Sequence, residues 1–72
     1  MPDWVSPRRR QIGTRIRSAR RTAGLSQLQL GLRIGRDHRT IHRWEYATAD
    51  PSLTDLLLLA DALGIPLPRL VE

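Results

Sequence analysis

The chain has 72 residues with a formal net charge of +5, and its twelve basic residues are all arginine. A chain of this length forms one small domain, which excludes a second core and a deep substrate pocket. The absence of cysteine excludes disulfides, thiolate zinc sites and cysteine nucleophiles. No stretch has signal-peptide character or approaches the roughly 20 apolar residues of a membrane span, so we expect a cytoplasmic protein without membrane contact.

The charges are unevenly distributed along the chain. Residues 1–43 contain eleven arginines and two acidic residues, whereas residues 44–72 contain one arginine and five acidic residues. A coding preference for arginine would explain the missing lysines but not this separation. The pattern predicts a molecule with one basic face directed at an anionic partner.

Residues 1–7 carry two prolines around Trp4 and show no hydrophobic periodicity. We therefore expect a flexible N-terminal arm, followed by a folded domain over residues 8–72. A first helix is predicted over about residues 8–23, with Gly24 as its stop. Its apolar stripe recurs at positions i, i+4, i+7 and i+11, and consists of Ile12, Ile16, Ala19 and Ala23.

A second helix is predicted over residues 27–34, with Ser26 as its N-cap and with Leu30 and Ile34 facing inward. Gly35 can adopt the left-handed conformation that ends such a helix. Gly31 has no side chain, so we expect two helix axes to approach each other closely at this position.

A third helix is predicted over about residues 38–46, capped by Asp37 and with Ile41 and Trp44 on its inner face. Pro51 introduces a fourth helix over residues 52–63, which Gly64 ends. Two prolines restrict residues 65–72 to a short fifth helix. No segment alternates as a strand does, so the sequence predicts an all-α bundle of four helices plus a short fifth. The expected core positions of the fourth helix are Leu53, Leu56, Leu59, Ala60 and Leu63.

Both histidines of the chain, His38 and His42, stand four residues apart and so share one face of the third helix. The zinc motif with this spacing has a glutamate after its first histidine, and here that position is Arg39. Zinc sites need three or four protein ligands, but the chain has neither a cysteine nor a third histidine. Ser26 and Ser52 also lack an evident base for a hydrolytic triad. We expect no metal, no cofactor and no enzymatic activity.

The same helical face has two further interpretations. The polar residues could form an ordinary solvated face opposite the core. The surrounding frame favours another reading, because two helices joined by a glycine-containing turn place the second helix in the major groove of DNA. Residues 27–46 have that frame, and the outward residues would then meet DNA; they are His38, Arg39, His42 and Arg43.

Three stretches carry a resemblance to a known family: "IGTRIRSARRTAGLSQ", "LGLRIGRDHRTIHRWE" and "PSLTDLLLLADALGIPLPRL". In order and spacing they resemble the phage-repressor-like helix-turn-helix family of lambda repressor and Cro, also called XRE-like, over roughly residues 12–71. The resemblance implies a lambda-repressor-like domain with its helix-turn-helix at about residues 27–46. It also implies sequence-specific binding of double-stranded DNA by a small transcriptional regulator, which would be associated with the nucleoid.

The resemblance also implies roles for individual residues. His38 and Arg39 match the first base-contacting positions, and His42 and Arg43 extend that face one turn further. Arginine can donate two bonds to guanine and histidine can donate to guanine N7, so we expect guanines in each half-site. For the DNA backbone the resemblance implies phosphate contacts from Gln27, which also buttresses the reading helix, and from Thr40 and Tyr46. We further expect phosphate contacts from Arg36, where the family usually has an apolar residue, and from Arg17 on the basic first helix.

Arg20 and Glu45 match positions where the family often places a partly buried ion pair between the first helix and the reading helix. The alternative is a surface pair of little energetic value. If the pair is buried, we expect Arg20 to be structural rather than DNA-contacting.

An apolar residue on the outer face of the fourth helix, Leu58, indicates a contact with another part of the molecule or with another chain. Packing against the N-terminal arm, where Trp4 lies, competes with contact to a second copy. Family dimers often meet near their last helices, so Leu67, Leu70 and Val71 are further candidates. We expect a weak homodimer that a palindromic DNA site reinforces.

A second function remains open at this point: a protein-interaction adaptor with the same fold, for example an antitoxin-like protein or the partner of a transcription component. An adaptor has no need for two histidines and two arginines together on one helical face. That face therefore favours the DNA-binding regulator.

Overall fold

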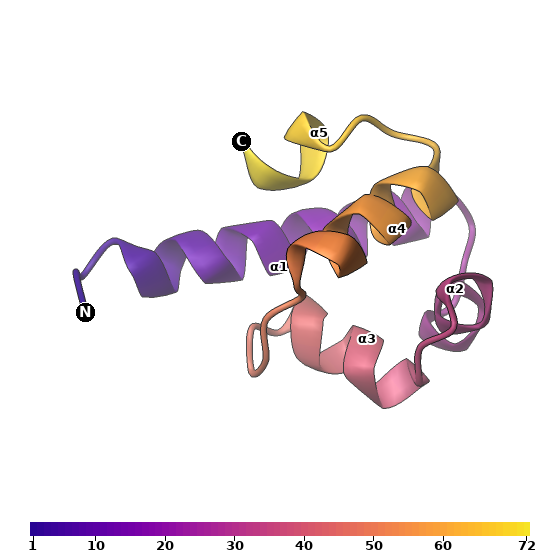
Figure 1. Cartoon of the computed structure of the whole chain (residues 1–72), viewed down its shortest axis with the longest axis horizontal. Coiled ribbons are helices and arrows are strands. Elements are labelled where there is room, and N and C mark those ends of the chain that lie inside the picture. The colour runs from indigo at the N-terminus through magenta and orange to yellow at the C-terminus, as the bar shows by residue number, and fades with distance from the viewer.

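Five helices and no strand make up the computed structural model, which describes all 72 residues from Met1 to Glu72. In chain order they are α1 (Val5–Thr22), α2 (Gln27–Ile34), α3 (His38–Glu45), α4 (Leu53–Leu63) and α5 (Pro68–Val71). The all-α prediction of four helices and a short fifth is confirmed. Helix α1 runs along the molecule, with α2 and α3 on one side of it and α5 on the other, while α4 crosses it (Figure 1). No helix has the length and apolar character needed to cross a membrane.

Helix α1 begins at Val5, three residues before the expected start at residue 8. Pro7 therefore lies in the first turn, where the missing N–H breaks no helical hydrogen bond because the first four N–H groups have no partner in the helix. The helix ends at Thr22, so Ala23 is an exposed cap residue rather than a part of the apolar stripe. Ile16 is fully buried, and Ile12 and Ala19 pack against the core.

The predicted caps are confirmed at both helices of the helix-turn-helix. The Ser26 hydroxyl accepts from the Gln29 N–H at 3.0 Å, and the Gln29 side chain accepts from the Ser26 N–H at 2.8 Å. Gly35 adopts the left-handed conformation (φ 70°) after α2. The Asp37 carboxylate then accepts from the Arg39 N–H at 2.7 Å and begins α3. Local capping chemistry thus fixes the turn between the two helices.

The core contains nine buried apolar residues contributed by all five helices: Ile16, Leu30, Ile34, Ile41, Trp44, Leu59, Ala60, Leu63 and Leu70. Leu53 was expected among them, but 67% of its surface is exposed. It is the first residue of α4, and because the Cα–Cβ bonds of a helix tilt toward its N-terminus, its side chain projects beyond the packed segment.

Two glycines allow backbone to approach backbone. A Cβ atom on Gly13 would lie 2.6 Å from the carbonyl oxygens of both Trp44 and Glu45, so α1 touches the main chain at the end of α3. A Cβ atom on Gly31 would collide with the carbonyl oxygen of Arg36. The expected close approach at Gly31 therefore involves the turn itself and not a second helix axis.

Gly13→Ala is expected to lower the free energy of unfolding by about 1–3 kcal/mol, because the added methyl group must push α3 away from α1. Alanine favours an isolated helix over glycine by about 1 kcal/mol, so a loss would show that the crossing decides the outcome. Urea denaturation measures the change. Ser18→Ala, at an exposed position of the same helix, is the control, and equal stabilisation of both variants would contradict the prediction.

Candidate nucleic-acid interface

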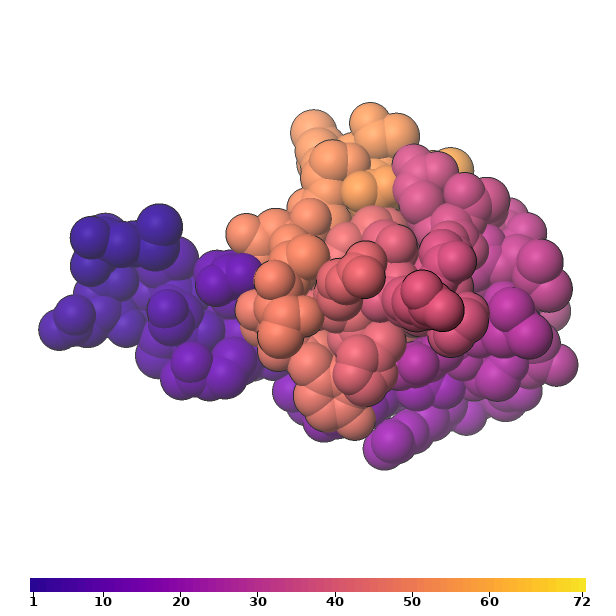
Figure 2. All heavy atoms as spheres, turned by 90° about the horizontal axis from the view of Figure 1, so that it is seen from below, coloured from indigo at the N-terminus to yellow at the C-terminus, as the bar shows by residue number.

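Helix α3 has a buried side and an exposed side. Ile41 and Trp44 are 0% and 4% exposed and face the core. The opposite side is formed by four exposed residues, called here the outer strip of α3: His38, Arg39, His42 and Arg43. Figure 2 shows α3 uncovered on the face turned to the viewer, with the N-terminal end of α1 projecting to one side. The sequence-predicted base contacts thus lie together on an accessible helical surface.

The charged groups of the outer strip are available to a partner. The guanidinium groups of Arg39 and Arg43 take part in none of the ion pairs within the chain. Nδ1 of His38 lies 3.7 Å from a carboxylate oxygen of Asp37, the residue that caps the helix. These positions give the start and the middle of α3 a basic, hydrogen-bond-donating surface.

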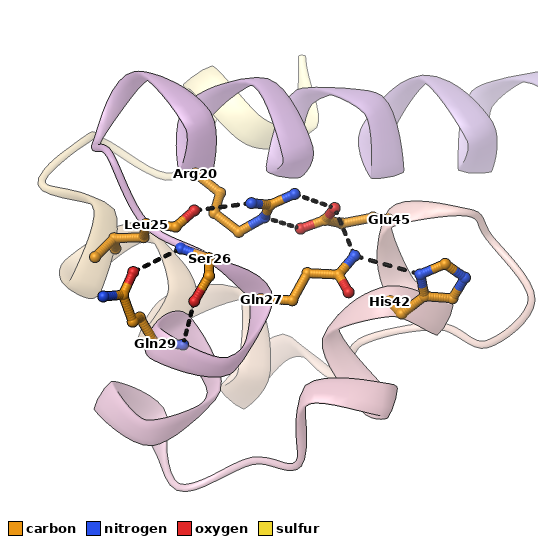
Figure 3. Close-up of polar contacts among 7 residues, drawn as sticks. All are labelled: Arg20, Leu25, Ser26, Gln27, Gln29, His42 and Glu45. Carbon is orange, nitrogen blue, oxygen red and sulfur yellow. Dashed lines mark hydrogen bonds and ion pairs between the residues drawn. The ribbon is translucent and has the colours of Figure 1, made fainter.

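The inner end of α3 is fixed to α1 by an ion pair between Arg20 and Glu45 (Figure 3). Arg20 donates from Nε to Glu45 Oε2 at 2.6 Å and from Nη2 to Oε1 at 3.0 Å. Its Nη1 donates to the Leu25 carbonyl at 2.8 Å. The side chains are 9% and 0% exposed, so this is a buried pair and not a surface one. The hydrogen bond to Glu45 raises the pKa of the Arg20 guanidinium, and the attraction of the carboxylate adds to it, while burial opposes both.

Gln27, the first residue of α2, lies between the buried pair and the outer strip. Its Nε2 is 3.2 Å from Glu45 Oε1 and 3.3 Å from Nδ1 of His42. One amide therefore links the carboxylate inside the molecule to an imidazole on its surface (Figure 3). The family resemblance implied that Gln27 meets a phosphate and buttresses the reading helix. The structure shows the two residues of α3 that its amide contacts, Glu45 and His42, which come together with it only in the folded chain.

The geometry agrees with the comparisons to known proteins. A family model described as helix-turn-helix matches residues 16–70 of the chain. The chain belongs to this family. The restriction-modification controller protein C.AhdI from Aeromonas hydrophila is 34% identical, with a TM-score of 0.82, over 85% of this chain and 92% of that one.

The P22 c2 repressor protein, solved in complex with the synthetic operator 9T, is 31% identical to this helix-turn-helix protein, with a TM-score of 0.79 and the same coverage of both chains. No curated protein sequence is significantly similar. The two solved structures make the fold lambda-repressor-like, as the sequence predicted.

A second basic surface of the helix-turn-helix protein adjoins the end of α3. The Tyr46 ring lies 4.6 Å from the His42 ring, centroid to centroid, and the Arg17 guanidinium stands 4.8 Å from the Tyr46 centroid. A shallow hollow opens here between α1 and α3, lined by Arg10, Thr14, Arg17, Glu45 and Tyr46. The sequence placed Arg17 and Tyr46 separately among the phosphate contacts, and the structure brings them together.

Other arginines of the helix-turn-helix protein are engaged within the chain. Arg36, expected to meet a phosphate, lies in an ion pair with Asp55 at 2.8 Å. Arg9 pairs with Asp50 at 2.7 Å. Burial acts to raise the pKa of Asp55, but hydrogen bonds from Ser52 and the Arg36 guanidinium outweigh it and hold that pKa below its usual value. These pairs join distant segments, and no local pattern in the sequence could have revealed them.

Thr40, the remaining expected phosphate contact, is half-buried on α3. His38 and His42 have no third histidine or acidic residue grouped with them in a way that could hold a metal ion.

The candidate dimer contacts of the helix-turn-helix protein divide into two groups. Leu70 was expected to be available to a second chain, but it is 0% exposed. That expectation was wrong, because the short α5 folds back on α1 and uses Leu70 to close the core. Leu67 and Val71 are partly buried, and Leu58 is 36% exposed. Trp4, the alternative neighbour of Leu58, is 68% exposed near the projecting end of α1.

Proposed function

We propose that this helix-turn-helix protein, a DNA-binding regulator by its family, binds specific sequences of double-stranded DNA and regulates transcription with α3 in the major groove. The observation that carries the proposal is the outer strip of α3, in which Arg39 and Arg43 have no partner in the chain. The opposite side of the same helix is packed and fixed by Glu45. A partner of opposite charge therefore meets a preorganised surface.

Arg39 and Arg43 suit guanine, since a guanidinium can donate two parallel bonds to O6 and N7. His38 and His42 can each add one bond to a base edge. These four residues would read the sequence, with guanines in each half-site. The P22 c2 repressor, which was solved with a synthetic operator, supports this use of the fold.

The phosphate contacts would surround this strip. Thr40 lies on α3 itself, Gln27 lies beside it at the start of α2, and the hollow with Arg17 and Tyr46 lies at its end. Arg36 would have to exchange Asp55 for a phosphate. Contacts of this kind position a protein on the duplex without reading its sequence.

A weak homodimer on a palindromic site would give each half-site its own reading helix. Leu58, Leu67 and Val71 are the accessible candidates for the contact between two copies. The dimer would owe much of its stability to the DNA.

Selection of bound sequences from a random duplex pool, at about 150 mM salt to suppress purely ionic binding, tests the proposal. We expect a palindromic motif that contains guanines. Arg39→Ala should blur one position of that motif and cost about 1–3 kcal/mol of discrimination there. Arg69→Ala is the matched control, because it removes the same charge from α5, on the opposite side of α1 (Figure 1). No enriched motif would overturn the proposal and direct attention to a protein partner.

A further inference from the structure

The hydrogen bonds that join Glu45, Gln27 and His42 determine which nitrogen of the His42 ring carries its hydrogen. Glu45 is fully buried and accepts two hydrogen bonds from Arg20, so it is held as a carboxylate, which can only accept. Its Oε1 also lies 3.2 Å from the side-chain amide of Gln27. Since the carboxylate has no hydrogen to give, the amide must present its nitrogen. The reverse orientation would place two acceptor oxygens against each other.

The orientation of Gln27 in turn fixes the hydrogen of His42. The amide nitrogen has two hydrogens; one points at Glu45 and the other at Nδ1 of His42, 3.3 Å away. Nδ1 must then be an acceptor. A neutral imidazole with a bare Nδ1 carries its hydrogen on Nε2.

The ring of His42 is also held in place. It lies against the Tyr46 ring, with 4.6 Å between the two centroids and 35° between the ring planes. The Arg17 guanidinium stands over the ring of Tyr46. In Figure 3 one ring nitrogen of His42 faces Gln27 and the other points away from it. His42 is exposed on the outer strip, so the hydrogen on Nε2, on the side of the ring away from Gln27, is accessible to a partner.

We infer that Glu45 and Gln27 are positioning residues that make His42 a hydrogen-bond donor to the major-groove edge of a purine. The inference rests on the proposed function for its DNA partner, but the state of the imidazole is a property of the free protein. Purine N7 and thymine O4 are acceptors, whereas the cytosine edge offers only its N4 donor. As a donor, His42 therefore discriminates against cytosine at its position. A residue buried against α1 thus contributes to sequence preference without touching DNA.

The first test needs no DNA. Long-range ¹H–¹⁵N spectra of the histidine rings, recorded at about pH 8.5 where an unperturbed imidazole is neutral, distinguish the two tautomers. We expect His42 in a single Nε2–H form, and a shift toward a tautomer mixture in Gln27→Ala. His38→Gln assigns the signals, and Gln11→Ala, at an exposed position of α1, is the matched control. A hydrogen on Nδ1 of His42, or a spectrum unchanged by Gln27→Ala, would overturn the inference.

The second test measures binding to the selected duplex in which single purines are replaced by their 7-deaza analogues, which lack only the N7 acceptor. The intact protein should lose about three- to tenfold in affinity at one purine of each half-site. That ratio should fall toward one in His42→Ala and part of the way in Gln27→Ala, where a fraction of the His42 rings still carries its hydrogen on Nε2.

Loss of a phosphate contact in Gln27→Ala would weaken both duplexes equally and leave the ratio unchanged, so the ratio isolates the role of His42. An unchanged ratio in Gln27→Ala would refute the inference while leaving the proposed function intact. If the first test succeeds and no sequence is selected, the proposed function fails, and with it the purine contact, but not the state of His42.

Discussion

Replacing Arg20 by alanine is expected to lower the free energy of unfolding by about 3–5 kcal/mol, because it leaves the Glu45 carboxylate charged and buried without its main partner. Glu45 is 0% exposed, and both of its oxygens accept from Arg20. Only the Gln27 amide would remain. A loss of this size is a large part of the stability of so small a domain. Urea denaturation followed by circular dichroism measures it.

Two further variants separate the charge from the packing. Arg21→Ala removes an exposed guanidinium from the next position of α1 and should change stability by less than 0.5 kcal/mol or so. The double variant Arg20→Met with Glu45→Leu removes both charges and should be clearly more stable than Arg20→Ala alone. A loss below about 1 kcal/mol in Arg20→Ala would instead place the pair among ordinary surface ion pairs.

Trp44→Ala is the second large effect, with an expected loss of about 3–5 kcal/mol. Trp44 is 4% exposed and packs α3 against the core beside Ile41. The cavity would open next to Gly13, where α1 and α3 are already in backbone contact, so the helices cannot approach further to fill it.

The two tryptophans of the chain provide the control. Trp4 is 68% exposed, so Trp4→Ala should leave the unfolding free energy nearly unchanged. Trp44→Phe keeps an aromatic ring and should cost less than Trp44→Ala. Thermal unfolding followed by circular dichroism compares the three variants. Equal losses in Trp4→Ala and Trp44→Ala would show that Trp44 does not hold α3.

Local signals predicted the fold well because capping residues mark most of the helix ends. Ser26, Asp37 and Ser52 begin three helices, and Gly35 and Gly64 end two of them. The start of α1 escaped prediction because proline is compatible with a first turn as well as with a flexible arm. Leu70 was misplaced because four residues of helix give no periodicity from which an inner face can be read.

The candidate site was predicted in its outer residues and not in its supports. The outer strip follows from helical spacing alone. The approach of Gly13 to the end of α3, and the pairing of Arg9 with Asp50, depend on how distant segments meet. The link from Glu45 through Gln27 to His42 likewise joins residues 15 and 18 positions apart. Contacts between such distant residues produce no periodic pattern in a single sequence, so they could not be predicted from it.

The separation of the two sides of α3 bears on how this protein can change over evolution. Ile41, Trp44 and Glu45 hold the helix in place, whereas His38, Arg39 and Arg43 hold nothing within the core. Under the proposed function, substitutions at these three surface positions would alter the preferred DNA sequence with little cost in stability, so single substitutions would suffice to change specificity. His42 is different, since it shares Gln27 with the buried carboxylate. A lineage that exchanges His42 is therefore expected to exchange Gln27 as well.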